Sequence, residues 1–318
     1  MPPLAIVIPA YKATFLSKTL DSLAQQTNQN FTVYVGNDAG PEGIAAIVDG
    51  FRDRLNIHYH HFENNIGGQS LVKQWERCLA LIQNEEWIWL LPDDDYADPE
   101  CVARFYNGLQ KSNFDLFRFN VHFVNADESI FKTNAALPAM QTAFDSLMEK
   151  LSFSRPSTVA EFIFNRKKFE SIGFTEIPMA WGTDDLLWYM LGKDKGIQNC
   201  NEAFVYLRQS HLNISNNYSS LGKKKIKANF EFFSKLIQTD LFETEMTDPN
   251  KKKLFRKTAI NHIFYNLEDF AIVLKPKEIF QFALSGNRIW GGGIIKNIHR
   301  FNLSNKRILK KCKKLNIE

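Results

Sequence analysis

The sequence predicts an α/β fold, in which a mainly parallel sheet is flanked by helices and followed by a basic helical extension. Three observations predict it. Short apolar, β-branched runs alternate with helix-spaced segments through the first hundred residues. Polar clusters stand where these runs end. From residue 222 onward the pattern becomes helical and strongly cationic.

Four strands are expected in the first hundred residues, with helices between them. Residues 4–8 form an apolar, β-branched run stopped by Pro9, which is typical of a buried parallel strand. The other strands are expected at residues 31–35, 56–62 and 87–91, and the helices at residues 14–26, 44–51 and 69–83. This order favours a parallel sheet with helices on both faces, and such sheets bind ligands at the carboxyl ends of their strands.

The middle of the chain is less regular. Strands are expected at residues 114–123, where polar and apolar residues alternate, and at 160–164, with short helices at 166–172 and 185–191. Farther on, helices are expected near residues 223–240, 250–273 and 276–284, before a break at Gly291-Gly292-Gly293. We therefore expect one domain over residues 1–221 and a helical, basic region over residues 222–318.

The charge is distributed unevenly between these two parts. Residues 222–318 hold 21 Lys and Arg against 9 Asp and Glu, a net of +12, which leaves residues 1–221 at −8. The basic part is open to two interpretations, peripheral contact with an anionic membrane or a solvated helical cap. Nucleic-acid binding is disfavoured, because no nucleic-acid motif is present and the front of the chain is acidic.

The sequence favours a reducing compartment. None of its four cysteines stands in a CxxC or other metal-type spacing, so we expect reduced thiols. The N-terminal apolar run is short and interrupted by Pro, unlike a secretory signal, and no stretch approaches the roughly 20 apolar residues that cross a bilayer. We expect a cytoplasmic protein, free or attached to the inner face of the membrane.

Three adjacent carboxylates, Asp93, Asp94 and Asp95, follow the strand at residues 87–91. Like charges this close repel one another, so the cluster costs stability unless a cation offsets it. Carboxylate oxygens suit Mg²⁺ or Mn²⁺, which usually bind one or two carboxylates together with substrate phosphates. A solvated acidic turn is the alternative interpretation, but the position at a strand end favours a metal.

An ordered set of motifs resembles family 2 glycosyltransferases, which have the GT-A fold. The set comprises Ile6-Val7-Ile8-Pro9-Ala10-Tyr11, Asn37-Asp38 after a strand, Asn65-Ile66-Gly67-Gly68, and the three aspartates followed by Pro99. It covers residues 4–100 and extends more loosely to residue 216. The resemblance implies a transferase that takes a sugar from a nucleotide diphosphate sugar.

The resemblance also implies where the nucleotide binds. Pro9, Ala10 and Tyr11 match the loop that holds the base, with Tyr11 as a stacking partner. Asp38 matches the carboxylate that accepts a hydrogen bond from the base, usually uracil, although the family's Asp-Asp-Gly-Ser is here Asn37-Asp38-Ala39-Gly40. Lys73 falls near the expected diphosphate, where a cation would offset phosphate charge.

Aligned with the family's Asp-x-Asp-Asp, the acidic segment reads Pro92-Asp93-Asp94-Asp95, so Pro replaces the first acid. The resemblance makes Asp94 the principal ligand of Mg²⁺ or Mn²⁺. It puts Asp93 near the donor ribose or sugar, and Asp95 in the role of a second or indirect ligand. His211, in the segment at residues 206–215, is a further candidate to bind the metal or a phosphate.

Gly182-Thr183-Asp184-Asp185-Leu186 resembles the family's Gly-Glu-Asp segment, which opens a helix. In inverting members that Asp is the general base, which makes Asp184 the expected base here. Thr183 replaces the usual Glu, so Asp185 is a second candidate. Read without the resemblance, this acidic segment could merely cap the helix.

We therefore expect an inverting, metal-dependent glycosyltransferase that uses a UDP-linked donor and a saccharide or lipid-linked acceptor in cell-surface polysaccharide synthesis. The first alternative is a nucleotidyltransferase, although the segment after Ile8 lacks the Gly-rich basic loop such enzymes carry. The second is a non-catalytic, membrane-docking protein that retains the fold. The loss of two family acids keeps that alternative open.

Overall fold

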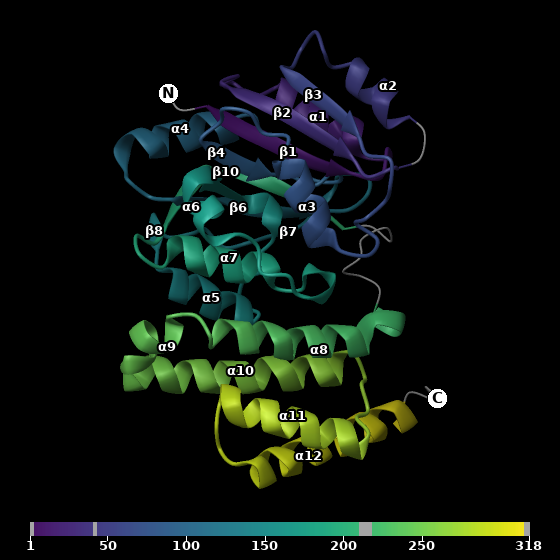
Figure 1. Cartoon of the computed structure of the whole chain (residues 1–318), viewed down its shortest axis with the longest axis vertical. Coiled ribbons are helices and arrows are strands. Elements are labelled where there is room, and N and C mark those ends of the chain that lie inside the picture. The colour runs from purple at the N-terminus through teal and green to yellow at the C-terminus, as the bar shows by residue number, and fades with distance from the viewer. Residues whose placement is uncertain (1–2, 41–42, 210–217, 315–318) are drawn as a thin grey trace. The chain divides into compact units, whose positions relative to one another are not determined.

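The computed structural model describes residues 3–40, 43–209 and 218–314 (Figure 1). The chain folds into two compact units. The first comprises Met1–Ser146, Ser157–Glu176 and Leu187–Asn213, and the second comprises Leu147–Pro156, Ile177–Leu186 and Ile214–Glu318. The second unit thus includes two segments from the N-terminal side of the division expected at residue 221, and that division stays a prediction.

The first unit is built on a mixed sheet, which has ten strands among the described residues. Its main path runs β3-β2-β1-β4-β9-β6-β10-β5, while β7 pairs with β6 and β8 with β10. The strands are β1 (Leu4–Ala10), β2 (Phe31–Asn37), β3 (Ile57–His61), β4 (Trp87–Leu90), β5 (Tyr96–Ala97), β6 (Leu116–Val124), β7 (Ile130–Thr133), β8 (Met140–Gln141), β9 (Phe162–Asn165) and β10 (Ile197–Arg208). β3, β2, β1 and β4 are mutually parallel, as are β6 and β10. The expected mainly parallel α/β fold is confirmed.

Helices follow the strands of the first unit and make up most of the second (Figure 1). In the described residues the α-helices are α1 (Leu16–Ala24), α2 (Ile44–Asp49), α3 (Leu71–Leu79), α4 (Cys101–Lys111), α5 (Ala143–Leu151), α6 (Arg166–Ile172), α7 (Thr183–Gly192), α8 (Tyr218–Leu236), α9 (Leu241–Thr244), α10 (Pro249–Asp269), α11 (Pro276–Ile289) and α12 (Ile294–Lys314). Within the described segments, no helix has the length and apolarity that crossing a bilayer requires. All four cysteines are free thiols.

Several strands and helices differ from the predictions. Pro9 does not stop β1, because it pairs with Gly36 and the strand ends at Ala10. The strand expected at residues 114–123 is β6, which runs from Leu116 to Val124, and nearly all of its residues are buried although polar and apolar residues alternate along it. β9 was expected, but it runs antiparallel to both of its neighbours. The sequence reasoning missed β10 and the helix α12 that follows the three glycines.

A buried ion pair connects β6 to the segment before β9. Arg118 and Glu161 are each 1% exposed, and the Arg118 Nε donates to Glu161 Oε2 at 2.8 Å. The Arg118 Nη1 also donates to Ser146 Oγ at 3.1 Å. Because removing one partner leaves the other charge buried and unpaired, Arg118→Met is expected to lower the free energy of unfolding by about 3–5 kcal/mol.

Urea denaturation measures this effect. The matched control is Arg54→Met, which breaks an exposed pair with Asp21 and is expected to cost less than about 1 kcal/mol. The double variant Arg118→Met/Glu161→Gln should regain part of the lost stability, since no charge then stays unpaired. Equal effects of Arg118→Met and Arg54→Met would contradict this interpretation.

Candidate active site

The polar ends of β1, β2 and β4 meet at one edge of the sheet. Ala10 pairs with Asn37 at the ends of β1 and β2, and the Asp38 N–H donates to the Ala10 carbonyl at 2.8 Å. The Asp93 carboxylate, just beyond β4, accepts hydrogen bonds from the backbone N–H groups of Tyr11 at 2.8 Å and Lys12 at 2.9 Å. The loop of residues 9–12 is therefore tied directly to the acidic segment, and Tyr11 stays exposed beside it.

Asp38 is a nearly buried anion, 3% exposed, surrounded by donors. Its Oδ1 accepts from the Ile66 N–H and its Oδ2 from the Gly67 N–H, each at 2.9 Å. The Arg77 guanidinium forms an ion pair with Oδ1. A carboxylate offers about four acceptor positions, so this arrangement leaves one on Oδ2. A Cβ at Gly67 would lie 2.5 Å from that oxygen, which explains why glycine is needed there.

Arg77 is a residue of the candidate site that was not predicted from the sequence. Besides Asp38, it donates to the Asn64 carbonyl at 2.9 Å, and its guanidinium lies 3.9 Å from the centroid of the Phe62 ring. Lys73, the cation expected near the diphosphate, lies one turn earlier on α3 with its side chain exposed. The spacing of four residues on one helix was the available signal, because it puts both cations on the same face.

Arg77→Met is expected to lower both stability and nucleotide affinity. Losing a charged partner of the buried Asp38 carboxylate should cost about 2 kcal/mol in the free energy of unfolding. Lys73→Met is the matched control for stability, which it should leave unchanged because no described side chain depends on Lys73; its expected place near the diphosphate means that it too should weaken nucleotide binding. Thermal unfolding and nucleotide titration of the two variants check this. An unchanged stability of Arg77→Met would show that Asp38 does not need its cation.

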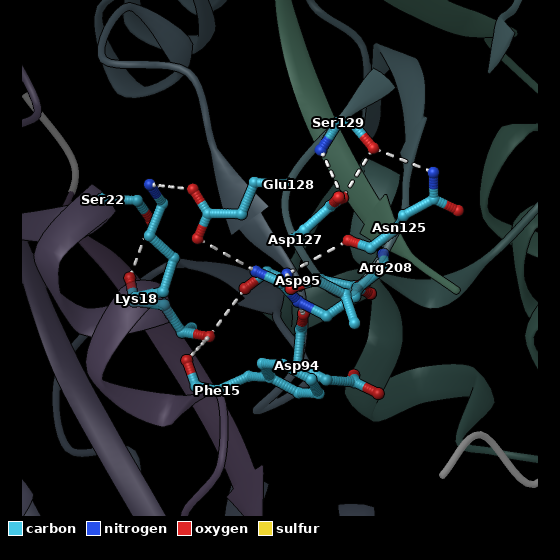
Figure 2. Close-up of polar contacts among 12 residues, drawn as sticks. Phe15, Lys18, Ser22, Asp94, Asp95, Asn125, Asp127, Glu128, Ser129 and Arg208 are labelled. Carbon is cyan, nitrogen blue, oxygen red and sulfur yellow. Dashed lines mark hydrogen bonds and ion pairs between the residues drawn. The ribbon is translucent and has the colours of Figure 1, made fainter. Parts of the chain in front are cut away.

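The three adjacent aspartates have different surroundings. Asp93 holds the loop after β1, and burial together with the charge of Asp94 raises its pKa to about 6. Asp95 is turned inward and accepts from the Arg208 N–H at 2.9 Å, and burial raises its pKa well above the usual value. Asp94 is half-buried; burial raises its pKa, while the charge of Lys12 and the backbone N–H of Asp94 itself lower it. Figure 2 draws no hydrogen bond from the residues shown there to its carboxylate. A carboxylate offers about four acceptor positions, so Asp94 retains acceptor positions for a ligand.

Arg208, at the end of β10, connects the acidic segment to a neighbouring loop (Figure 2). Its Nε donates to the Asp94 carbonyl at 3.1 Å and its Nη1 to the Ala126 carbonyl at 2.9 Å. Its Nη2 lies 3.5 Å from Glu128, which also pairs with Lys18 at 2.7 Å. A single buried cation therefore fixes the backbone of the acidic segment. The sequence points to His211 instead, which lies outside the described residues.

The residues present fit a divalent cation. No group of three or more His, Cys, Asp and Glu close enough for metal binding occurs in the described part of the chain. A Mg²⁺ site does not require three protein ligands, because the ion is commonly held by one or two carboxylates with substrate phosphates and water. Asp94 supplies a carboxylate that retains acceptor positions. The expected roles of Asp93, Asp94 and Asp95 in donor and metal binding stay predictions.

The segment before α7, in the second unit, has a strained backbone. Met179 and Ala180, in a 3₁₀ turn at Pro178–Ala180, have φ angles of 62° and 55°, and Gly182 has φ 86°. A Cβ at Gly182 would come within 2.7 Å of the Phe232 ring. The Trp181 indole N–H donates to Asn229 Oδ1 at 3.1 Å, which holds the segment on α8. Strain of this kind persists where surrounding packing imposes it, and it clusters at functional sites.

Asp184 and Asp185 lie in the first turn of α7 and differ in environment. Asp185 is buried and lies 3.5 Å from the Lys150 ammonium. Asp184 is half-buried, and burial followed by the charge of Asp185 raises its pKa to about 7. A carboxylate that titrates near neutral pH is suited to take up a proton during a reaction. The geometry therefore favours Asp184 over Asp185 as a base.

Comparison with known proteins gives a family match and distant relatives. The model of the family described as glycosyl transferase family 2 matches residues 5–188. The chain is 27% identical over 138 residues to the Staphylococcus aureus poly(ribitol-phosphate) beta-N-acetylglucosaminyltransferase TarS, covering 41% of this chain and 23% of TarS. It is also 27% identical over 121 residues to the Mycoplasma pneumoniae processive diacylglycerol beta-glycosyltransferase, covering 37% of this chain and 35% of that protein. These alignments span only a minority of each relative's length.

Solved structures of S. aureus TarS are similar over nearly the whole chain. The structure of TarS 1–349 in complex with UDP-GlcNAc matches with a TM-score of 0.71 at 16% identity, covering 99% of this chain and 92% of that one. TarS 1–349 in complex with UDP matches with a TM-score of 0.69 at 15% identity. At such identities the likeness concerns the fold, and it confirms the expected GT-A architecture.

Proposed function

The chain belongs to glycosyl transferase family 2, and from that premise we propose that it transfers a sugar from a UDP-linked donor to a saccharide or lipid-linked acceptor, with inversion at the anomeric carbon. We further propose that it acts in cell-surface polysaccharide synthesis; one relative is named for glycosylation of poly(ribitol-phosphate) and the other for glycosylation of diacylglycerol. The observation that carries the proposal is the edge of the sheet where Asp38, the loop of residues 9–12 and Asp93 lie together.

Each residue of that edge has a proposed task. The remaining acceptor position of Asp38 receives a hydrogen bond from the uracil ring, and the exposed Tyr11 ring stacks on it. Asp93 keeps the base-binding loop close to the acidic segment and faces the donor ribose or sugar. The ammonium of Lys73 offsets charge on the diphosphate.

Asp94, with Asp95 behind it, is proposed to hold Mg²⁺ or Mn²⁺. When bound, such an ion neutralises the negative charge that grows on the departing diphosphate. His211 is proposed to assist there, as a metal or phosphate contact.

Asp184 is the proposed general base. It accepts the proton of the acceptor hydroxyl as that oxygen attacks the anomeric carbon on the face opposite the diphosphate. Attack from the opposite face inverts the anomeric centre and requires no covalent enzyme intermediate. Asp185, paired with Lys150, lies next to Asp184, whose pKa is raised first by burial and second by the charge of Asp185.

A thermal-shift screen tests the donor assignment. UDP-, GDP- and dTDP-sugars are compared with and without Mn²⁺, and UDP-N-acetylglucosamine is included because TarS was solved with it. We expect a Mn²⁺-dependent rise in Tm confined to uridine nucleotides, because a ligand that binds only the folded state stabilises it. In Asp94→Asn the Mn²⁺-dependent part of the shift should disappear. Equal shifts with all three bases would rule out recognition of uracil.

A further inference from the structure

Helix α12 carries an uncompensated positive charge. Its 21 residues include eight Lys and Arg and no Asp or Glu. Among the described residues, only Arg307 of this helix forms an ion pair, with Glu268 at 3.4 Å. The charge of α12 is therefore not neutralised within the part of the chain that the structure describes.

One face of α12 is fully used in packing. Asn297, Phe301, Ser304 and Ile308 are buried and recur at helical spacing. α12 lies beside α11 in Figure 1, and the Phe301 ring packs against Phe282 of that helix. This inner face accounts for the attachment of the helix to its unit, so the residues on the opposite face are not needed for it.

The outer face of α12 combines lysines with exposed apolar side chains. We define it as Ile295, Leu303, Lys306, Leu309, Lys310 and Lys313. Ile295 is 84% exposed, Leu303 40% and Leu309 47%. Lys306, Leu309, Lys310 and Lys313 line a shallow hollow of about 430 Å³. No carboxylate of the described residues pairs with these three lysines.

We propose that the outer face of α12 binds the surface of an anionic phospholipid bilayer. The lysines are complementary to anionic head groups, which attract each basic residue near the membrane surface. The apolar side chains beside them can enter the boundary between head groups and acyl chains. A soluble polyanion would account for the lysines but not for a largely exposed isoleucine on the same face. The inference does not depend on sugar transfer.

Sedimentation with vesicles tests this inference on the full chain. We expect binding to phosphatidylcholine vesicles that contain phosphatidylglycerol, and little binding to phosphatidylcholine alone. Removing three charges in Lys306→Gln/Lys310→Gln/Lys313→Gln should weaken the binding about 100-fold. The control Lys253→Gln/Arg256→Gln/Lys257→Gln removes three exposed charges from α10 and should retain most of the vesicle binding. Equal losses in both variants would overturn the assignment to α12.

A second variant tests the apolar contribution. Ile295→Ser/Leu303→Ser changes only exposed side chains, and we expect it to weaken the vesicle binding that persists at high salt, where charge attraction is screened. An unchanged affinity of this variant, together with full displacement from vesicles by inorganic polyphosphate, would instead identify a polyanion site. Thermal unfolding of every variant, expected to match that of the wild type, shows that the fold is retained.

Discussion

The Asp184→Asn variant is expected to lose about a thousandfold in kcat while its KM for the donor stays close to the wild-type value. The amide cannot accept the acceptor's proton, but it keeps the shape of the side chain. Steady-state transfer assays with saturating acceptor measure the loss. At pH above 7 the variant should also unfold at a higher temperature than the wild type, which there must keep a charged carboxylate in a partly buried position.

The pH dependence follows from the same carboxyl group. Because the pKa of Asp184 is raised to about 7, activity should rise with pH through that value as the base loses its proton. The free energy of unfolding changes in the opposite direction. The contribution of the neutral Asp184 carboxyl to stability is present at low pH and is lost as pH rises through about 7. Asp185→Asn removes a neighbouring negative charge, so it should move the rise in activity to lower pH. If the pH dependence of activity were the same in Asp184→Asn as in the wild type, another group would be the base.

The second large effect is expected at Asp94. Asp94→Asn should lower turnover about 100-fold or more and weaken Mn²⁺ binding, because its carboxylate is the proposed metal ligand. Its neighbours serve as controls with different outcomes. Asp95→Ala should mainly lower stability, since it leaves the buried Arg208 N–H without its acceptor. Asp93→Asn should mainly raise the donor KM, since Asp93 fixes the loop of residues 9–12.

Turnover of UDP-sugar and Mn²⁺ titration followed by electron paramagnetic resonance separate these effects. If all three variants lost Mn²⁺ binding and stability to the same degree, the distinct environments of the three carboxylates would have no functional meaning. If Asp94→Asn bound Mn²⁺ as the wild type does, Asp94 would not be its ligand.

Local sequence patterns predicted much of the sheet and the edge where the site lies. The strands β1, β2 and β4 are short, mostly apolar runs whose polar ends are visible in the sequence, whereas β3 holds three histidines among its five residues. Local pattern does not predict that β9 runs antiparallel to β4 and β6, because the direction of a strand depends on strands that are distant in the chain. The helix α12 was not predicted, because the polar residues Asn297 and Ser304 alternate with Phe301 and Ile308 on its buried face.

The two arginines of the site show why the remainder could not be predicted. Arg77 is separated from Asp38 by 39 residues, and the Arg208 backbone N–H from Asp95 by 113. Neither spacing is a motif, and only the folded sheet brings the partners together. The family pattern instead points to Lys73 and His211.

A crystal structure with UDP and Mn²⁺, in which anomalous scattering locates the metal, tests the central claim most directly. The account predicts a manganese peak about 2 Å from an Asp94 carboxylate oxygen and in contact with the diphosphate. It also predicts the uracil ring at Asp38 and the Asp184 carboxylate facing the side from which an acceptor approaches. Manganese bound away from Asp94, or a nucleotide bound away from Asp38, would contradict it.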